Sequence, residues 1–364
     1  MGLEGGDVMA EKVMVGMSGG VDSSVAAALL LQQGYDVAGM TLKLKPEYGC
    51  MAGWSHEAED ARRVADKLGI PHYVVDLTKP FAQNVIDYFV EEYLHGRTPN
   101  PCVACNRTIK FGAMLEKARE LGYNRIATGH YASIEKKDGR YLLKRSPAGK
   151  DQSYVLYHLT QNQLAHTVLP LCTYEKEEIR RLAERYRLPV AHKPDSQEIC
   201  FIPDDDYASF IRDYAGKTTP PGDFVDEKGN VLGQHKGILH YTVGQRKGLG
   251  IAFGRPMYVR TIDPEKNQVV LVEGGKEYFT GLMADGVNFI PFDWPQEEMK
   301  VEVMVRYQSR LTPARLVPLD DNKVQVLFDA PIRAVTPGQA AVFYRGDLVL
   351  GGGRIVKSIP LEEE

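Results

Sequence analysis

The sequence predicts an α/β domain built on a parallel sheet, then a small loop-rich domain, then an antiparallel β-barrel. Up to about residue 210, short apolar runs alternate with helical patterns. The next stretch is rich in glycine and turn residues, and from about residue 276 apolar residues recur at every second position. We therefore expect domains over residues 1–210, 211–275 and 276–364.

The N-terminal part alternates expected strands with expected helices. The expected strands cover residues 12–17, 36–44, 72–77 and 125–132. The expected helices cover residues 25–34, 57–69, 83–95 and 113–121, and Gly34 and Gly69 close the first two. Strands that alternate with helices form βαβ units, so we expect a parallel sheet covered on both faces.

The rest of the chain changes character twice. GKTTPPGDF, DEKGNVLGQHKG and TVGQRKGLG are turn-rich and predict a small irregular domain. Apolar alternation then returns over residues 301–307, 323–328 and 339–355, and Arg345-Gly346-Asp347 marks a turn inside the last run. This pattern is typical of antiparallel strands in a barrel or sandwich.

Charge restricts how the protein can bind nucleic acid. The 364-residue chain has a formal net charge of −4, so the whole molecule is not a general polyanion binder, and any nucleic-acid site must be a local basic patch. Ten basic residues could form such a patch: Lys144, Arg145, Arg180, Arg181, Arg185, Lys193, Arg246, Lys247, Arg306 and Arg310.

The expected compartment is a reducing cytoplasm. The first residues, MGLEGGDVMAEK, do not resemble a signal peptide, and no apolar run is long enough to span a membrane. Five scattered cysteines in a chain of this size are not a disulfide scaffold. Any thiol with a function should therefore be reactive or metal-bound.

The strongest local signal is GMSGGVDSS, residues 16–24, between an expected strand and an expected helix. Glycines let the backbone approach an anion, and a helix N-terminus presents N–H groups to it. The stretch lacks the lysine of a Walker A loop and the glycine spacing of a dinucleotide loop. The ordinary structural interpretation is a turn in which Ser18 or Asp22 caps the helix. We favour a phosphate loop because two glycines, three serines and an aspartate converge there.

The cysteines raise a second question. Cys102 and Cys105 lie in TPNPCVACNRTIKFG, residues 98–112, and could form a metal site, a redox pair, a nucleophile with a neighbour, or buried thiols. Cys172 and Cys50 fit the last interpretation, which is the usual fate of a thiol. Cys105 and Cys200 lie in polar, loop-like stretches, which favours reactivity.

Several motifs resemble a known family. SGGVDSS resembles the pyrophosphate loop of the N-type ATP pyrophosphatases, whose fold is the adenine nucleotide alpha-hydrolase type. The ordered motifs GRTPNPCVACNRTIKFG, ATGHYA, KDQSYVLY, DSQEICFIP, HYTVGQRKGLGI and TPGQAAVFY closely resemble the tRNA-specific 2-thiouridylase family. The resemblance runs from about residue 12 to 356, nearly the whole chain.

This resemblance implies an ATP-dependent reaction in which AMP is transferred to the C2 oxygen of the wobble uridine and sulfur then replaces that oxygen. It assigns ATP binding to Gly16, Met17, Ser18, Gly19, Gly20, Val21, Asp22, Ser23, Leu42 and Gly129. Asp22 is the candidate Mg²⁺ ligand. Leu42 and Gly129 could equally be ordinary strand-end residues.

The resemblance also makes Cys105 the nucleophile and Cys200 the carrier of a persulfide, supplied by a cysteine desulfurase or a sulfur-relay protein. Release of the sulfur would leave a disulfide bond between the two thiols. Cys102 departs from the pattern, because many family members have an aspartate there. Together Cys102, Cys105 and Cys200 could instead hold an iron–sulfur cluster. We favour the persulfide relay.

The resemblance implies that tRNA binds through its anticodon arm, held by the C-terminal barrel. It assigns contacts with the target base to Asn100, Pro101 and Cys102. It assigns other tRNA contacts to His130, Lys150, Asp151, Gln152, Arg306, Tyr307 and Gln339. His130 could also be a structural histidine at a strand end.

Two rival functions remain at the level of sequence. One is a ligase of the same ATP pyrophosphatase class acting on a small molecule, although no glutaminase-like motif is apparent and two functional thiols are unnecessary there. The other is a non-catalytic RNA-binding protein, which would not need a phosphate loop.

Overall fold

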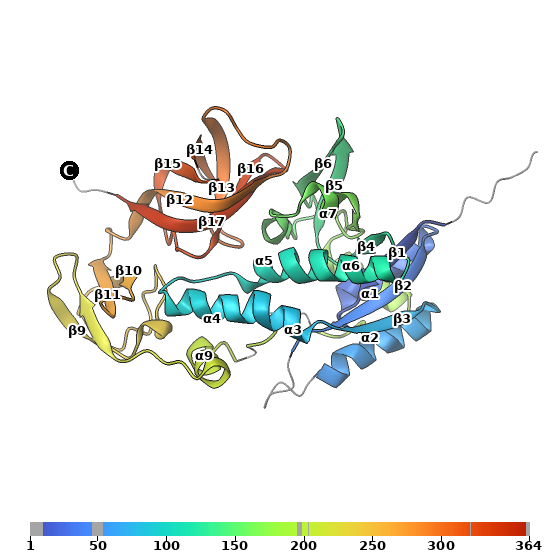
Figure 1. Ribbon diagram of the computed structural model, residues 1–364, viewed down its shortest axis with the longest axis horizontal. Coiled ribbons are helices and arrows are strands. Elements are labelled where there is room, and N and C mark those ends of the chain that lie inside the picture. Colours follow the sequence, from blue (N-terminus) through green and yellow to red (C-terminus); the bar gives the residue numbers. More distant parts are fainter. Residues whose placement is uncertain (1–9, 46–53, 195–198, 203, 321, 362–364) are drawn as a thin grey trace, which may run out of the picture. The chain divides into compact units, whose positions relative to one another are not determined.

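The computed structural model describes residues 10–45, 54–194, 199–202, 204–320 and 322–361 (Figure 1). The chain divides into two compact units that interleave along the sequence. Unit 1 comprises Met1–Ala82, Asn106–Ser153 and Gln161–Ser196, and unit 2 comprises Gln83–Cys105, Tyr154–Thr160 and Gln197–Glu364. No helix in these ranges is both long and apolar enough to cross a membrane.

Unit 1 is built on a parallel sheet, as the sequence predicts. Its strands are β1 (Lys12–Gly16), β2 (Asp36–Lys43), β3 (His72–Asp76), β4 (Arg125–Ala127) and β7 (Thr167–Val168), in the order β3-β2-β1-β4-β7. Strands added after β1 first extend one side of the sheet, and β4 then starts the other side. Ligands of such sheets bind where the order reverses, beyond the carboxyl ends of the strands. Here that point lies between β1 and β4.

Helices cover both faces of this sheet, which confirms the predicted fold class. α1 (Val21–Gln32), α2 (Trp54–Leu68) and α8 (Lys176–Arg185) share one core with Val13 and Val15 of β1. On the opposite face, Met114 of α6 (Met114–Glu120) reaches Gly16, where an added Cβ would lie 3.0 Å from the Met114 sulfur. A β-hairpin, β5 (Ala132–Lys137) and β6 (Arg140–Arg145), completes the unit's strands.

The central part of unit 2 is more regular than its glycine-rich sequence suggests. It forms a four-stranded sheet in the order β10-β11-β8-β9. Its strands are β8 (Gly222–Val225), β9 (Val231–His235), β10 (Met257–Asp263) and β11 (Gln268–Glu273). Phe224 is fully buried among apolar residues of these strands and of the following loops. The strands are short and separated by turns, so the apolar alternation that predicts a strand is hard to detect.

The C-terminal part of unit 2 is the predicted antiparallel barrel (Figure 1). Its strands are β12 (Tyr278–Phe289), β13 (Met299–Met304), β14 (Thr312–Pro318), β15 (Val324–Arg333), β16 (Ala340–Arg345) and β17 (Leu348–Pro360). They follow the order β12-β15-β14-β13-β16-β17, and β17 pairs with β12 to close the barrel. Closure leaves no open sheet edge, and alternate side chains fill the interior.

A buried carboxylate attaches α4 (Asp87–Leu94) to this barrel. Glu92 is only 5% exposed and accepts hydrogen bonds from Arg97 at 2.8 Å and from Arg354 of β17 at 3.2 Å. Arg354 also donates to Asp285 of β12 at 2.9 Å. That hydrogen bond raises the pKa of the Arg354 guanidinium. The helix that leads toward the predicted thiol segment is therefore held by charge as well as by packing.

We predict that Glu92→Gln lowers the free energy of unfolding of unit 2 by about 1–3 kcal/mol, because its charge-assisted hydrogen bonds are lost. The control is Glu91→Gln, since Glu91 is 53% exposed and pairs only with Lys217 in the described structure. That change should cost about 0–1 kcal/mol. Thermal melting and hydrogen exchange of the β12 and β17 amides measure the difference. Equal effects of the two changes would contradict a structural role for the buried carboxylate.

Candidate active site in two parts

The first part of the site is the start of α1, directly after β1. Gly20 is the N-cap residue, and within the described ranges no side chain caps the helix. The interpretation of Ser18 or Asp22 as N-cap is therefore wrong, because Asp22 already lies in the first turn. An uncapped first turn has N–H groups available for an anion. This geometry is what a phosphate loop requires.

The loop is braced by its own hydroxyl groups. Ser23 donates to the Gly20 carbonyl at 3.3 Å and accepts from the Ser18 N–H at 3.3 Å, while Ser24 donates to Gly20 at 2.8 Å. The neighbouring strand β2 adds Thr41, which donates to the Met17 carbonyl at 2.8 Å and lies 2.8 Å from His72 Nε2. These bonds fix the backbone without occupying the anion position with a side chain.

Gly19 and Lys193 attach the loop to α2. Gly19 has φ +68°, and an added Cβ would lie 2.4 Å from the Glu57 carbonyl oxygen, so only glycine fits. The Lys193 ammonium donates to the Gly19 carbonyl at 3.1 Å and to Asp60 of α2 at 2.9 Å. Lys193, which the sequence suggested as part of a phosphate-binding surface, thus contacts the loop's own backbone.

Gly129 lies against the other side of the loop. An added Cβ would lie 2.8 Å from the Ser23 nitrogen and 3.0 Å from the Asp22 Cβ. β4 ends at Ala127, five residues earlier than the predicted strand, because the chain then crosses the start of α1. The structure thus brings the predicted ATP residues Gly16–Ser23 and Gly129 together. Leu42 lies half-buried at the carboxyl end of β2.

The Asp22 carboxylate gathers two ammonium groups and a phenol. Lys176 Nζ lies 2.6 Å from Oδ1, Tyr131 donates to Oδ1 at 2.8 Å, and Lys150 Nζ lies 3.5 Å from Oδ2. The Lys150 ammonium also lies 4.6 Å from the centre of the Tyr131 ring. Lys150, predicted as a tRNA contact, therefore lies beside the phosphate loop. Sequence reasoning missed Lys176 and Tyr131.

Three other predicted tRNA residues of unit 1 have internal partners. Asp151 accepts from the Ser146 N–H at 3.1 Å and from the Ser153 hydroxyl at 2.9 Å. The Gln152 side chain accepts from the Tyr131 N–H at 3.1 Å. His130 is buried, with Nδ1 2.8 Å from the Thr128 hydroxyl. Burial lowers its pKa well below the usual value, and the charge of Lys110 acts in the same direction.

The second part of the site begins with α5 (Pro101–Cys105) in unit 2. Asn100 precedes it, and its side-chain oxygen accepts from the Val103 N–H at 3.3 Å. Proline at the first helical position suits a helix start. The segment is thus a short helix, which corrects the loop expected around Cys105. Cys102 is exposed, whereas Cys105 is buried with 7% exposure.

A loop of the barrel holds the backbone just before α5. The Gln339 amide donates to the Thr98 carbonyl at 2.9 Å, and the Thr98 N–H donates to the Pro337 carbonyl at 2.9 Å. An added Cβ at Gly338 would lie 2.8 Å from the Thr98 nitrogen. The predicted tRNA residue Gln339 therefore holds the backbone two residues before Asn100, which is also a predicted tRNA residue. Arg306 and Tyr307 are exposed on the barrel, with the Tyr307 ring 5.9 Å from that of Tyr154.

Cys200 lies on an exposed turn whose next residues are buried anchors. The Ile202 N–H donates to the Ile199 carbonyl at 2.8 Å, so Cys200 and Phe201 occupy the corner of the turn. Phe201 is 2% exposed, and its ring lies 5.5 Å from Phe89 of α4 and 5.2 Å from Phe210 of α9 (Tyr207–Ala215). The buried Phe201 ring therefore fixes the position of the exposed Cys200 beside it.

The described residues contain no group of three or more His, Cys, Asp or Glu side chains placed to hold a metal ion. The arrangement of Cys102, Cys105 and Cys200 that a cluster would need therefore finds no support among them. Cys172 is half-buried, and burial raises the pKa of its thiol, which suits a structural residue. Cys50 and residues 195–198 of the DSQEIC motif lie outside the described residues.

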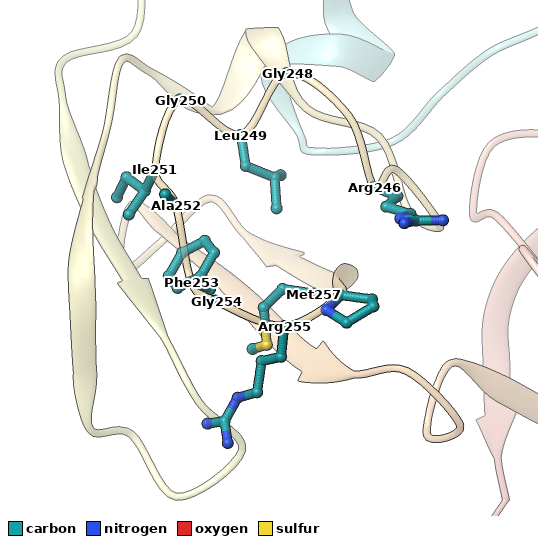
Figure 2. A pocket seen from close by; sticks show the side chains of 11 residues that line it. Arg246, Gly248, Leu249, Gly250, Ile251, Ala252, Phe253, Gly254, Arg255 and Met257 are labelled. Atoms are coloured by element: carbon teal, nitrogen blue, oxygen red, sulfur yellow. The ribbon is translucent and has the colours of Figure 1, made fainter.

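A separate pocket lies in the central domain. It has a volume of about 660 Å³ and is formed by the loop from Arg246 to Met257 (Figure 2). Figure 2 shows Leu249 and Met257 pointing into it, with Arg246 and Arg255 at its rim. Arg255 pairs with Glu273 at 3.0 Å, and Arg246 is exposed. None of the predicted ATP or thiol residues lines this pocket.

An uncapped glycine loop at the reversal point of a parallel sheet defines unit 1 as a nucleotide-binding domain of the HUP type. Family models match the chain in three consecutive parts: a tRNA methyl transferase HUP domain over residues 11–204, a tRNA methyl transferase PRC-barrel domain over 208–273, and an aminomethyltransferase β-barrel domain over 279–355. The first of these covers more than half of the chain.

Curated relatives give the finer family. The chain is 54% identical to the tRNA-specific 2-thiouridylase MnmA of Acetivibrio thermocellus, over 95% of this chain and 99% of that protein. It is 51% identical to the protein of that name from Clostridioides difficile, over 96% and 99% of the two chains. For the one from Carboxydothermus hydrogenoformans the identity is 52%, over 96% and 98%. The chain belongs to the tRNA-specific 2-thiouridylases, a family of sulfurtransferase enzymes, which confirms the resemblance of its motifs.

We predict that Gly129→Ala weakens ATP binding about tenfold to a hundredfold, because the new Cβ must displace the Ser23 amide by a fraction of an ångström. Gly122→Ala is the control. Gly122 has φ +83° but no described atom within 4 Å of an added Cβ, so that change strains only its own turn. Calorimetric titration with MgATP measures both variants. Normal affinity in Gly129→Ala would contradict the close approach as the element that shapes the loop.

Proposed function

We propose that the protein is a tRNA-uridine 2-sulfurtransferase that uses ATP to replace the C2 oxygen of the wobble uridine with sulfur from a persulfide on Cys200. Family membership supports the reaction class. The observation that supports the mechanism is that one chain has both an uncapped glycine loop at a helix start and, in its other unit, an exposed thiol next to a buried aromatic anchor. A small-molecule ligase of the same ATP-using class would not need that thiol.

The first step activates a poor leaving group. The uracil O2 attacks the α-phosphorus of ATP, an O–P bond forms, and the bond between the α-phosphorus and the bridging oxygen breaks. Pyrophosphate leaves with the electron pair, and the C2 oxygen now carries AMP. The amides at the start of α1, which no side chain caps in the described structure, would hold the phosphates. Asp22 would hold Mg²⁺, which would supply positive charge to the phosphates.

The second step transfers sulfur. The outer sulfur of the Cys200 persulfide attacks C2, and AMP leaves with the C2 oxygen. The Cys105 thiolate then attacks Cys200 Sγ, the S–S bond to the transferred sulfur breaks, and that sulfur keeps the electron pair as 2-thiouridine. A Cys105–Cys200 disulfide remains, so each turnover needs a thiol reductant. Cys105 is buried before the reaction, and burial protects it from competing oxidants.

tRNA binding completes the proposal. The anticodon arm would bind the barrel domain, 276–364, and the exposed Arg306 and Tyr307 offer a charge and a ring to a single-stranded loop. Asn100, Pro101 and Cys102 would contact the extruded base. Domains over 1–210 and 211–275 would carry ATP chemistry and further backbone contacts. Because ATP, tRNA and a cysteine desulfurase or sulfur-relay donor are all required, we place the reaction in the cytoplasm.

The decisive experiment incubates unmodified tRNA with the full-length protein, ATP, Mg²⁺ and a persulfide donor, followed by mass spectrometry of the nucleosides. The expected product is 2-thiouridine at the wobble position, formed only with ATP. A methylated nucleoside, or no tRNA-dependent release of pyrophosphate, would overturn the proposal. ATP consumption without tRNA but with a small acceptor would instead support a ligase.

Cys200→Ser should abolish 2-thiouridine formation but leave tRNA-dependent pyrophosphate release near the normal rate, because only the sulfur carrier is lost. Cys172→Ser is the matched control, since that thiol is half-buried and hydrogen-bonded within unit 1. It should keep both activities. Thiolation by Cys200→Ser with the same persulfide donor would contradict the assignment of the carrier.

Variants of Cys102 distinguish the persulfide relay from the iron–sulfur cluster alternative. In the relay, Cys102→Asp should retain substantial activity and Cys102→Ala should slow the reaction about 10²–10⁴-fold, as expected when one general base is lost. If Cys102, Cys105 and Cys200 held iron, both variants should fail together, because aspartate is a poor substitute for a soft ligand. Anaerobic reconstitution with iron and sulfide, with iron counted per chain, measures this. Full activity without iron would exclude the cluster.

A further inference from the structure

The segment Tyr154–Thr160 of unit 2 makes hydrogen bonds both with the barrel and with α5. Tyr154 is buried, and its hydroxyl donates to the Ala340 carbonyl of β16 at 2.8 Å. Asn288 of β12 donates to the Tyr157 carbonyl at 2.9 Å. The segment is therefore fixed to two strands of the barrel.

The fit of this segment against a third strand is close. An added Cβ at Gly352 of β17 would lie 2.7 Å from the Tyr157 ring, so the ring packs directly on the strand backbone. The centre of that ring lies 5.1 Å from the centre of the His158 imidazole. His158 is itself buried. Its position is thus determined by the wall of the barrel.

The His158 imidazole reaches α5 in the middle of the pair of cysteines. Its Nε2 lies 2.7 Å from the carbonyl oxygen of Val103, which stands between Cys102 and Cys105 in the chain. A carbonyl oxygen only accepts hydrogen bonds, so this contact places a proton on Nε2. A helix of five residues has little stability of its own, and its orientation depends on contacts from outside.

One short piece of the barrel holds the α5 region at two points. Gln339 donates to the Thr98 carbonyl at 2.9 Å, in the backbone before α5. The next residue, Ala340, accepts from the segment that carries His158. His158 in turn donates to Val103 within α5. The start of β16 therefore fixes both the approach to α5 and the helix itself.

We propose that His158 is a positioning residue for sulfur transfer, which acts by fixing α5 and with it the Cys105 thiol. This inference rests on the role of Cys105 in the function proposed above. In that step the Cys105 thiolate attacks Cys200 Sγ in line with the S–S bond that breaks, and the transferred sulfur leaves with the electron pair. Displacing a reacting atom by about 1 Å can slow such a step about 10²-fold.

The alternative is that His158 only fills space in the core of unit 2. Substitutions by three residues separate the two interpretations. Glutamine places an N–H donor where Nε2 stands, asparagine is too short to reach Val103, and phenylalanine keeps a ring but has no donor. A space-filling role favours phenylalanine over glutamine, whereas positioning through the hydrogen bond favours glutamine over phenylalanine.

The test uses the full-length protein in excess over unmodified tRNA, with ATP, Mg²⁺ and a persulfide donor, so that one turnover is observed. His158→Phe and His158→Asn should form 2-thiouridine about tenfold to a hundredfold more slowly. Pyrophosphate release should keep its normal rate, because the phosphate loop belongs to unit 1. His158→Gln should recover most of the rate of 2-thiouridine formation.

A second measurement needs no tRNA. Alkylation of Cys105, followed by mass spectrometry of its peptide, should be several-fold faster in His158→Phe and His158→Asn, because the buried thiol is exposed more often when α5 is less firmly held. His158→Gln should be alkylated at the normal rate. His166→Phe is the matched control, since His166 also bonds to a carbonyl, that of Asn162 at 2.7 Å, but outside α5. It should leave both measurements unchanged.

Three results would overturn the inference: normal 2-thiouridine formation in His158→Phe, no recovery in His158→Gln, or equal slowing of pyrophosphate release and thiolation. If the His158 variants do not fold, Tyr154→Phe takes their place, because it removes the hydrogen bond to Ala340 and leaves α5 unchanged. It should slow only 2-thiouridine formation, and a normal rate there would then overturn the inference.

The two measurements also separate this inference from the proposed function. If the wild type forms no 2-thiouridine while alkylation of Cys105 still follows the donor at position 158, the proposed reaction is wrong and the hold on α5 remains. If the wild type forms 2-thiouridine and neither measurement responds to His158→Phe, only the positioning role is wrong.

Discussion

The close approach of the Gly129 backbone to the first turn of α1 is the contact on which the nucleotide part of the site depends. It is possible only because residue 129 has no side chain, since any Cβ would lie 2.8 Å from the Ser23 nitrogen. Parallel strands β1 and β4 bring the two segments to the same edge of the sheet. Once β4 ends there, Tyr131 follows directly and reaches Asp22. The end of β4 thus accounts both for the packing of Gly129 against α1 and for the hydrogen bond from Tyr131 to Asp22.

The two exposed cysteines of unit 2 share a different arrangement, in which the thiol is exposed and its neighbours in the chain are buried, whereas the proposed nucleophile Cys105 is itself buried. Cys200 follows this rule through Phe201, and Cys102 follows it through Pro101 and the Asn100 cap. Both segments depend on α4: Phe89 packs on Phe201, and Glu92 fixes the helix to the barrel. An exposed thiol on a rigid base remains accessible to a donor while its position is set by the core.

Local patterns in the sequence predict much of this structure. Gly16–Ser23 follows a buried strand and precedes a helix, so the phosphate loop could be found from order alone. The barrel strands alternate clearly enough to be predicted. Lys176 and Tyr131 could not be found, because 154 and 109 residues separate them from Asp22 and no local pattern reports a contact made through the fold. The helical start at Pro101 was missed because PCVAC has no apolar period.

The position of Asp22 in the first turn of α1 also affects which anions a loop of bare amides can accept. Helix N-termini bind phosphate, sulfate and carboxylate with little discrimination, because their amides recognise only negative charge. Asp22 lies in the first turn of α1 and repels any such anion, while Lys176 and Lys150 lie close to its carboxylate. A ligand that carries positive charge of its own would meet less of this repulsion. Selectivity at such a loop is a difference in binding free energies, so a carboxylate that repels anions matters beside the amides that attract them.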